Sequence, residues 1–445
     1  NMTTISDQSP LEHDGPLPDS ADVVIVGGGI IGITTAWYLS RQGLRILVCE
    51  KGRVAAEQSS RNWGWIRQQG RDEAELPIIM ESIQLWENLG RDIGVDIGFR
   101  REGSLYLCEN EAELARHDEF LSLSKQYGLD TRQLNSSELY ELIRETPQKW
   151  RSALYTPGDG RAEPTLAVPA IARACAREGV TILENCAVRK ISTANNRVDG
   201  ISTERGFVKC TSVVCCGGSW SASLLNQCGI YLPQLSVKAS VASTAKAPLI
   251  FNGNAADNRL AFRRRQDGGY TIALTSYLEV FPSIQSLSQL KIFLPLLRIS
   301  FKKLKLRIDK HWLEQFFPQS RWSEEDISPF EKYRVLNPVP TAKTQARLRK
   351  VLDDRLPVMR EVGITESWSG MIDATPDAVP VMDRVDGFEG LFVATGFSGH
   401  GFGLGPAAGR IMADLVQNNR VEHDLSRFRF SRFSDGSRLK LGPSI

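Results

Sequence analysis

A glycine cluster between two apolar runs constrains this chain more than any other feature. Residues 22–26 form the first run, three glycines follow at G-x-G-x-x-G spacing, and residues 45–49 form the second run, which ends at Glu50. A helix between the runs completes a βαβ unit whose small residues let backbone amides approach a pyrophosphate. Glu50 is placed to accept from ribose hydroxyls, and an acidic residue there argues against a 2′-phosphate. The unit predicts binding of NAD or FAD, and the alternative is a glycine-rich turn without a ligand. The expected contacts are Gly27, Gly29, Ile30, Ile31, Gly32, Glu50 and Lys51.

The composition indicates a folded protein of about two domains. The chain has 445 residues, 42% hydrophobic and 24% charged, and its 54 Lys and Arg against 52 Asp and Glu leave a net charge of +2. This near-zero net charge argues against an overall electrostatic attraction to nucleic acid or to a membrane. The 8 cysteines contain no C-x-x-C pair and the 5 histidines are scattered, so we expect a reducing compartment and no metal site. Residues 1–19 are polar and no apolar run reaches about 18 residues, so we expect a disordered N-terminus and a soluble cytoplasmic protein.

Three further segments favour FAD over NAD. The sequence SSRNWG at 59–64 follows the βαβ unit, VVCCGGSW at 213–220 reads as a strand and turn, and ATGFSGHGFG at 394–403 is a glycine-rich loop before a helix. In this order, over residues 22–417, the segments resemble the FAD-dependent oxidoreductases of the D-amino-acid oxidase and glycine oxidase superfamily.

The resemblance implies how these segments hold the flavin. The Ser-Ser segment would run under the flavin, and the strand and turn would close the FAD site. The late loop would meet the O2 edge and the ribityl chain, where a helix dipole stabilises the negative charge of reduced flavin. The contacts expected in addition to the βαβ unit are Ser59, Ser60, Arg61, Asn62, Trp63, Gly64, Val188, Gly217, Trp220, Gly396, Phe397, Ser398, Gly399, His400, Gly401, Phe402 and Gly403.

Departures from the superfamily pattern limit what the resemblance implies. Sarcosine oxidases of the superfamily attach flavin through a Cys, and the matching stretch 368–377 has none; dimethylglycine-type dehydrogenases use a His where this chain has Arg61-Asn62. We therefore expect non-covalent FAD. The strand 270–274 also lacks the Lys that promotes reaction with oxygen in sarcosine oxidases, so oxidase and dehydrogenase chemistry both stay open.

The substrate anchor is expected to be an arginine, because a planar guanidinium binds a carboxylate with two hydrogen bonds. Arg259 and Arg263 share one face of the predicted strand 259–265, and the alternative is an exposed basic strand end. We expect Arg263 to be the anchor with Arg259 beside it, and Arg67 and Arg321 are next in line. Gln68, Gln69 and Phe397 occupy positions that line the cavity in related deaminases, and Trp368 is expected to form an apolar wall or core.

Residues 285–312 form a basic amphipathic pattern with apolar residues at three- and four-residue spacing. We expect a helical insertion, broken or kinked near Pro295. It would pack on the substrate domain or form a dimer interface, and the alternative is contact with an anionic membrane surface.

Together these features predict a two-domain α/β protein. Its FAD-binding domain is expected to be Rossmann-like, of the glutathione-reductase type, and its substrate domain a mixed-sheet α+β unit. The FAD-binding domain is assigned to 20–75, 150–230 and 366–425, the substrate domain to 76–149 and 231–365 with the insertion 285–315, and a tail to 426–445. The expected activity is oxidative deamination of a free amino acid, with an L preference that rests on overall likeness, and reduction of O2 to H2O2. The alternative is a D-amino-acid or secondary-amine dehydrogenase that passes electrons to a quinone or other carrier. We expect the protein to form a homodimer, and we expect no nucleic-acid partner.

Overall fold

A six-stranded sheet forms around the predicted βαβ unit in the computed structural model, which describes residues 3–281, 290–307 and 321–443. The strand order is β20-β21-β12-β1-β2-β8, and neighbouring strands are parallel except β20, which is antiparallel to β21. The strands are β1 (Val23–Val26), β2 (Ile46–Cys49), β8 (Thr181–Leu183), β12 (Ser212–Cys215), β20 (Val381–Arg384) and β21 (Leu391–Thr395). The sheet therefore takes its strands from three distant stretches of sequence.

Alternate residues of the central strands face two different hydrophobic cores, as the period of two in a strand requires. Val23 and Ile25 join the core that contains residues of four α-helices, whereas Val24 and Val26 join the core that contains an antiparallel three-stranded sheet. The helices are α1 (Ile30–Ser40), α3 (Leu76–Ile93), α7 (Pro164–Arg177) and α14 (Gly401–Val416), and the small sheet is β9 (Val188–Ala194), β10 (Arg197–Thr203) and β11 (Gly206–Lys209). Helix α3 packs on α14.

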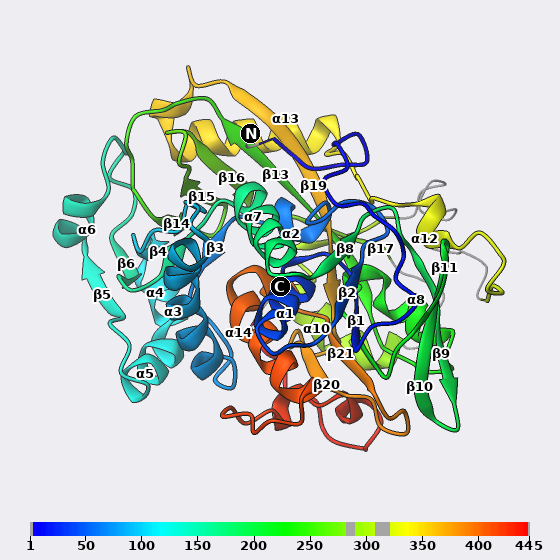
Figure 1. Cartoon of the computed structure of the whole chain (residues 1–445). Helices are drawn as coiled ribbons and strands as arrows, with labels where there is room; N and C mark the ends of the chain where they lie inside the picture. Colours follow the sequence, from blue (N-terminus) through cyan, green and yellow to red (C-terminus); the bar gives the residue numbers. More distant parts are fainter. Residues whose placement is uncertain (1–2, 282–289, 308–320, 444–445) are drawn as a thin grey trace.

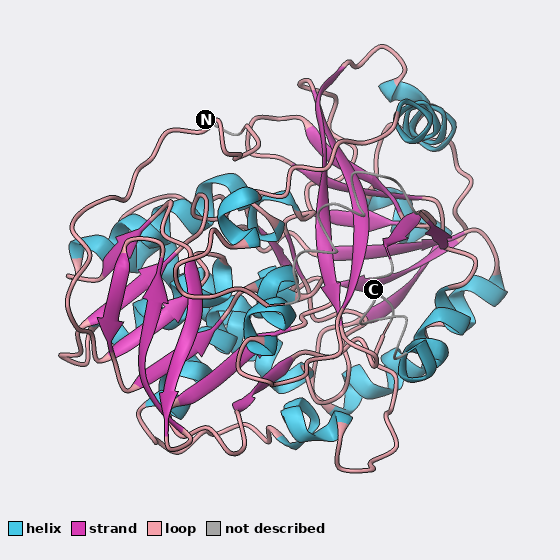
Figure 2. Ribbon diagram, turned by 90° about the vertical axis from the view of Figure 1, so that its right-hand side faces the viewer, coloured by secondary structure: helices cyan, strands magenta, loops and turns pink. Residues whose placement is uncertain are grey.

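A second, ten-stranded sheet lies beside the first (Figures 1 and 2). Its order is β18-β17-β13-β16-β15-β14-β4-β6-β5, and β19 pairs with β13. The strands are β4 (Ser104–Cys108), β5 (Arg132–Asn135), β6 (Ser152–Thr156), β13 (Leu235–Thr244), β14 (Asn254–Ala256), β15 (Leu260–Arg264), β16 (Tyr270–Leu274), β17 (Leu278–Phe281), β18 (Leu304–Leu306) and β19 (Ile364–Ala374). Residues of α6 (Ser136–Leu142) and α13 (Ala342–Arg355) share a core with this sheet.

The remaining strands and helices form neither of the two large sheets. The remaining strands, β3 (Trp65–Ile66) and β7 (Gly160–Arg161), pair with each other. The remaining α-helices are α2 (Gln58–Arg61), α4 (Glu111–Ala115), α5 (Asp118–Gln126), α8 (Ser221–Asn226), α10 (Leu290–Ser300) and α12 (Pro329–Lys332). The 3₁₀ turns are η1 (Gly218–Trp220), η2 (Pro357–Met359), η3 (Ser426–Phe428) and η4 (Phe430–Phe433).

The predicted fold class is confirmed, and two strands lie in a different sheet from the one their expected domain implies. β6 was assigned with the nucleotide domain, but it pairs antiparallel with β4 of the second sheet. β19 was assigned likewise, and it pairs with β13 along nearly its whole length. The local sequence of neither strand specifies which sheet it joins, so only the long-range pairing decides their place.

The N-terminal segment was expected to be disordered, and polar contacts instead tie residues 5, 9, 12 and 13 to α2 and to the loops after β2 and β8. Arg61 donates to the carbonyl of Ile5 at 2.9 Å, and Arg53 donates to that of Ser9 at 2.8 Å. Glu184 accepts from the backbone amides of residues 12 and 13 at 3.1 and 2.9 Å. A polar segment with few apolar residues is ordered here because buried side chains from elsewhere bind its backbone.

The described part of the insertion, residues 290–307, forms α10, β18 and a short turn between them, and the rest of the insertion lies outside the described part of the chain (Figure 1). Phe293 and Leu296 pack against Leu235, Val237 and Val280, which gives the helix one buried face. The expected packing on the substrate domain is therefore observed for α10.

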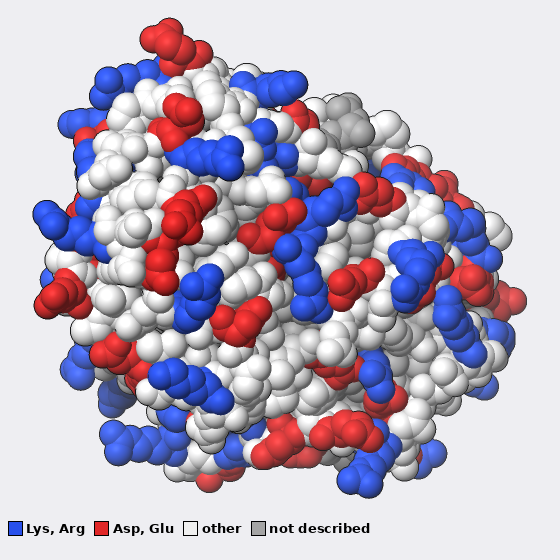
Figure 3. Space-filling model, turned by 90° about the vertical axis from the view of Figure 1, so that its left-hand side faces the viewer, with Lys and Arg blue, Asp and Glu red and all other residues white. Residues whose placement is uncertain are grey.

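The surface near α5 and α6 carries intermingled acidic and basic side chains (Figure 3). This face has no extended patch of one sign, in keeping with the near-zero net charge. Within the described residues, no helix is long and apolar enough to cross a membrane.

Candidate active site

A cavity of about 310 Å³ opens at the carboxyl ends of the parallel strands of the first sheet. Residues that directly follow β1, β2 and β12 line one side, and residues of β13, β16 and β19 from the second sheet line the other. Ligands of open α/β sheets bind in this position, outside the carboxyl ends of the strands. The cavity therefore lies where the βαβ unit predicts a nucleotide.

Glycines shape the cavity wall at the start of α1. A Cβ on Gly32 would lie 2.0 Å from the carbonyl oxygen of Gly27, so only glycine allows the helix to begin this close to β1. Gly29 faces Ser59, whose Oγ accepts a hydrogen bond from the backbone N–H of Ile30 at 2.8 Å. The positive end of α1 and a hydroxyl thus lie in the cavity together, a donor set that suits a pyrophosphate.

Glu50 fixes two loops, those that contain Gly28 and Gly52, beside the expected ribose position. Its Oε2 accepts from the Gly28 amide and its Oε1 from the Gly52 amide, both at 2.8 Å. Burial is the main reason that the pKa of Glu50 is raised. The carboxylate lines the cavity at the end of β2, as the sequence predicts for a ribose acceptor.

We expect Glu50→Ala to weaken FAD binding about ten- to a hundredfold, equivalent to about 1.5 to 3 kcal/mol for a charged hydrogen bond. Equilibrium titration of the apoprotein with FAD measures the change. Glu50→Gln is the matched control, because it keeps the side-chain length and one acceptor oxygen and should lose less affinity. An unchanged FAD affinity in Glu50→Ala would mean that the carboxylate serves only the backbone of its own loops.

The Ser-Ser segment forms the short helix α2 against the cavity. Ser60 Oγ is buried and has no hydrogen-bond partner among the described residues. Arg61 holds the helix in place, since it donates to the carbonyls of Ala56 at 2.7 Å and Ser369 at 2.9 Å. Asn62 Oδ1 accepts from the Gly64 amide at 2.8 Å, which fixes the turn that follows. The segment presents the Ser59 hydroxyl and an ordered backbone to the cavity, which fits a flavin nucleotide.

The late glycine loop is held by Asp373 of β19. Its Oδ2 accepts from the Gly396 amide at 2.7 Å and from Thr395 Oγ1 at 3.0 Å, and burial raises the pKa of this carboxyl. Gly396 and Ser398 have φ values of 71° and 53°, a left-handed backbone that this bonding stabilises. The loop aims the N-terminus of α14 at the cavity.

Most of the predicted cofactor residues line this one cavity. They are Gly27, Gly29, Ile30, Ile31, Glu50, Lys51, Ser59, Arg61, Asn62, Trp63, Val188, Gly217, Trp220, Phe397, Gly399, His400, Gly401, Phe402 and Gly403. The other five do not line it but directly adjoin lining residues in sequence, namely Gly32, Ser60, Gly64, Gly396 and Ser398. Lys51 has a structural role there, because its Nζ binds Glu57 at 2.8 Å and lies 4.5 Å from the ring centre of Trp220.

The two arginines expected to anchor the substrate do not reach the cavity. Arg263 is 1% exposed and pairs with Glu163 at 2.9 Å, and it also donates to the Trp63 carbonyl at 2.5 Å. Arg259 is 41% exposed and pairs with Asp354 at 2.7 Å. Arg263 therefore supports the end of the Ser-Ser segment, and Arg259 lies at the surface. Arg321 is exposed.

Gln68, Gln69 and Trp368 also do not line the cavity. Gln68 donates from its backbone and side chain to Asp159 at 2.7 and 3.2 Å. Gln69 Nε2 donates to the Leu154 carbonyl at 3.1 Å, and Trp368 Nε1 donates to the Arg61 carbonyl at 3.0 Å. These contacts fix the segment after β3 and the end of α2.

The side chains of Arg67 and Arg71 do line the cavity. Burial and the neighbouring Arg71 lower the pKa of Arg67 to about 9, so its guanidinium is protonated at neutral pH but poorly compensated. Arg71 is 7% exposed and its Nε has no hydrogen-bond partner among the described residues. Unlike Arg263, neither side chain has an ion pair in the described part of the chain. Two such cations favour an anionic ligand. The sequence offered Arg67 only as a later choice, and nothing in it singled out Arg71.

His400 directly precedes α14 and lines the same cavity as these arginines. Its Nδ1 lies 3.3 Å from Glu75 Oε1, and its buried Nε2 has no partner among the described residues. Burial and then Arg71 lower the pKa of His400, which favours the neutral ring. Although burial opposes ionisation of Glu75, His400 and Arg71 lower its pKa.

A parallel sheet with a glycine cradle, a ribose acceptor and a serine-rich segment is the architecture of an FAD-binding oxidoreductase, and the described donor set fits that cofactor. The family model DAO, FAD dependent oxidoreductase, matches residues 22–415, and the chain belongs to this family.

Solved structures with this fold include two deaminases. L-Amino acid deaminase from Proteus myxofaciens, in complex with anthranilate, has a TM-score of 0.91 at 29% identity, with 96% of each chain covered. L-Amino acid deaminase from Proteus vulgaris has a TM-score of 0.90 at 27% identity, with 95% of this chain and 100% of that chain covered.

Curated relatives include enzymes named for sarcosine. Mitochondrial sarcosine dehydrogenase of Mus musculus is 25% identical over 95% of this chain, which spans only 42% of that protein's length. The beta subunit of sarcosine oxidase from Rhizobium meliloti is 23% identical, over 93% of this chain and 89% of that protein.

Proposed function

We propose that the protein catalyses FAD-dependent oxidative deamination of a free α-amino acid. The observation that carries the proposal is the pair Arg67 and Arg71, which lines the same cavity as the nucleotide cradle. A buried carboxylate binds only where a cation compensates the loss of water, and these guanidiniums lack other ion pairs within the described residues. Arg67, which forms the less compensated charge, takes the carboxylate, and Arg71 supports it.

Apolar side chains surround the proposed substrate position. Trp65, Ile79, Leu274 and Leu278 line the cavity, and Phe397 belongs to the late loop. Such walls exclude water and leave the carboxylate contacts to fix the orientation of the α-carbon. They favour an amino acid with an apolar side chain over one with a second charge.

The chemistry balances with FAD as the hydride acceptor. Bound FAD supplies a site that takes the hydride of the α-carbon, and the amine nitrogen then forms a double bond to that carbon and releases its proton. Water adds to the resulting imino acid, which gives the 2-oxo acid and ammonia. The arginines hold the carboxylate throughout, and the amine must arrive uncharged for the hydride to leave. We propose non-covalent FAD, since neither Cys nor His occupies the attachment positions of the resembling enzymes.

The L preference draws support from the Proteus structures, which are named L-amino acid deaminases. For the electron acceptor we propose O2, with H2O2 as its product.

A membrane-bound electron carrier is a second candidate acceptor, and the insertion favours it. Ile299 and Phe301 are 68% and 78% exposed, and Arg298 and Lys302 lie beside them in sequence. Exposed apolar residues among basic ones suit the surface of an anionic membrane, where a quinone would be available.

Anaerobic mixing of the holoenzyme with a panel of L- and D-amino acids tests the proposal. We expect L-amino acids with apolar side chains to bleach the flavin, and readmitted air to restore its colour with release of H2O2. Restoration by a soluble quinone, faster with anionic vesicles and slow in air, would replace O2 with a carrier. Bleaching by sarcosine and none by amino acids with a primary amine would reject the deamination.

A further inference from the structure

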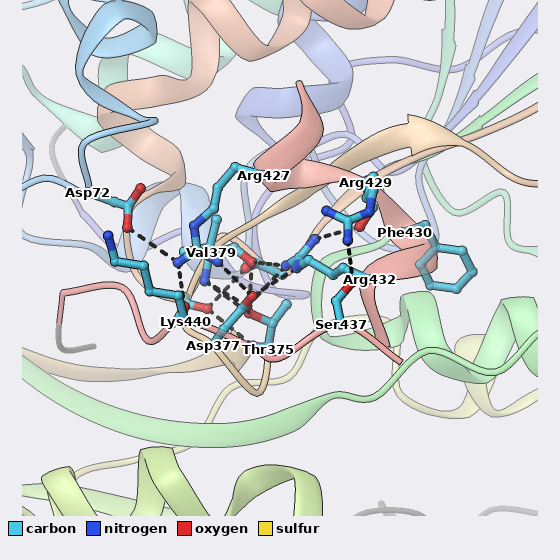
Figure 4. Close-up of polar contacts among 12 residues, drawn as sticks. Asp72, Thr375, Asp377, Val379, Arg427, Arg429, Phe430, Arg432, Ser437 and Lys440 are labelled. Atoms are coloured by element: carbon cyan, nitrogen blue, oxygen red, sulfur yellow. Dashed lines mark hydrogen bonds and ion pairs between the residues drawn. The ribbon is translucent and has the colours of Figure 1, made fainter. Parts of the chain in front are cut away.

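The C-terminal segment 426–443 connects the two sides of the proposed active site through a buried ion-pair network (Figure 4). Its centre is Asp377, in the turn between β19 and β20, whose side chain is completely buried. Arg432 binds this carboxylate through Nε at 2.9 Å and Nη2 at 3.1 Å, and Arg427 binds it through Nη1 at 3.2 Å. Thr375 Oγ1 donates to the same carboxylate at 3.1 Å.

The turn that contains Asp377 supports the late glycine loop. The backbone N–H of Thr375 donates to Ser398 Oγ at 3.2 Å, and this hydroxyl donates to the Gly396 carbonyl at 3.0 Å. A Cβ on Gly396 would lie 2.3 Å from Cγ2 of Thr375, so the turn and the loop are in close contact. A shift of Asp377 is therefore transmitted to the loop that faces the flavin.

Arg427 also reaches the segment on the other side of the cavity. Its Nη2 donates to Asp72 Oδ2 at 3.3 Å and to the Lys440 carbonyl at 2.5 Å. Asp72 directly follows Arg71, and its Oδ1 accepts from the Ala74 amide at 2.9 Å as the chain turns into α3. Asp72 therefore fixes the end of the short segment 67–72 that presents both cavity arginines.

The two arginines of the network have different roles. Arg432 and Arg427 face Asp377 and Asp72, so two cations balance two carboxylates. Loss of Arg427 leaves Asp377 with its two bonds to Arg432, and the turn keeps its main support. Asp72, by contrast, loses the cation that ties it to the rest of the site.

We propose that Arg427 is a positioning residue that sets the segment 67–72 relative to the late glycine loop. It thereby fixes where the substrate carboxylate is held with respect to the flavin. This inference rests on the proposed function, because it concerns the anchor of an amino-acid substrate. It gives the C-terminal segment a role in substrate binding through Asp72.

The test compares Arg427→Gln and Asp72→Asn with the wild-type holoenzyme. We expect the KM for an amino acid and the Kd for benzoate, followed by its effect on the flavin spectrum, to rise about tenfold in each variant. The double variant should be no worse than either single one, because both remove the same contact. FAD content should stay normal, and Arg427→Lys should recover part of the affinity.

Arg429→Ala is the matched control within the same segment. The Arg429 side chain pairs with Asp435 at 2.9 Å and has no hydrogen bond or ion pair with Asp72 or Asp377 within the described residues, so KM and Kd should not change. Wild-type KM and Kd in Arg427→Gln would overturn the inference, as would additive effects in the double variant. If the wild-type flavin is not bleached by amino acids but benzoate binding still weakens in Arg427→Gln, the positioning stands and the proposed reaction fails.

Discussion

Arg67→Ala should lower kcat/KM for an amino acid by at least about a hundredfold, which corresponds to the 2 to 5 kcal/mol typical of removing one partner of a buried charge pair. The guanidinium lines the cavity, and it has no ion pair among the described residues. Burial lowers its pKa, because few neighbouring charges compensate for the lost water. The substrate carboxylate would otherwise be buried beside apolar walls without a cation, which is too costly to bind. FAD content should stay normal, since Arg67 follows the Ser-Ser segment.

Steady-state kinetics with an amino acid and with its descarboxy amine measure this effect. The wild type should prefer the carboxylated compound, and Arg67→Ala should lose that preference because only the carboxylate contact is removed. Arg259→Ala is the matched control, an exposed arginine paired with Asp354 whose loss should leave kcat/KM unchanged. If Arg67→Ala retains the preference, the carboxylate is held elsewhere, and Arg71→Ala becomes the next variant to measure.

The nucleotide cradle could be predicted from sequence because contiguous segments build it largely from backbone. The glycines before α1 and the acidic end of β2 carry their signal in spacing alone, and the Ser-Ser segment and the late loop carry theirs in short motifs. Each recognises the cofactor through amides, hydroxyls or a helix end whose geometry is set locally. Accordingly, most of the cofactor-binding residues that the sequence indicated line the observed cavity.

The substrate anchor could not be predicted in the same way. The period of two correctly predicts that Arg263 belongs to a strand, β15, although Arg259 directly precedes that strand. It does not tell which groups oppose each side chain. Arg263 pairs with Glu163, a residue 100 positions earlier that directly precedes α7, and no local pattern reveals that partner. The contacts of Asp377 with the C-terminal segment are hidden for the same reason, since they span 50 and 55 positions.

Gly29→Val should yield a folded protein that does not retain FAD. The backbone of Gly29 has φ −78° and ψ −177°, an extended conformation that valine adopts readily. The nearest atom to an added Cβ is Ser59 Oγ at 2.9 Å, whereas a Cβ on Gly27 or Gly32 would meet a backbone carbonyl oxygen at 2.3 or 2.0 Å. Valine at position 29 therefore fills the space for the pyrophosphate while the fold around β1 and α1 survives, which substitution of the other two glycines would not allow.

Three measurements together isolate this effect: the absorbance of purified protein at flavin wavelengths, far-UV circular dichroism, and the midpoint of thermal unfolding with and without added FAD. We expect wild-type secondary structure, about a hundredfold or greater loss of FAD affinity, and a midpoint that no longer rises with FAD, because a ligand stabilises only the state that binds it. Gly363→Val is the control, since no atom lies within 4 Å of its added Cβ, and it should retain FAD. A yellow Gly29→Val protein with wild-type flavin content would show that the pyrophosphate does not lie at the start of α1.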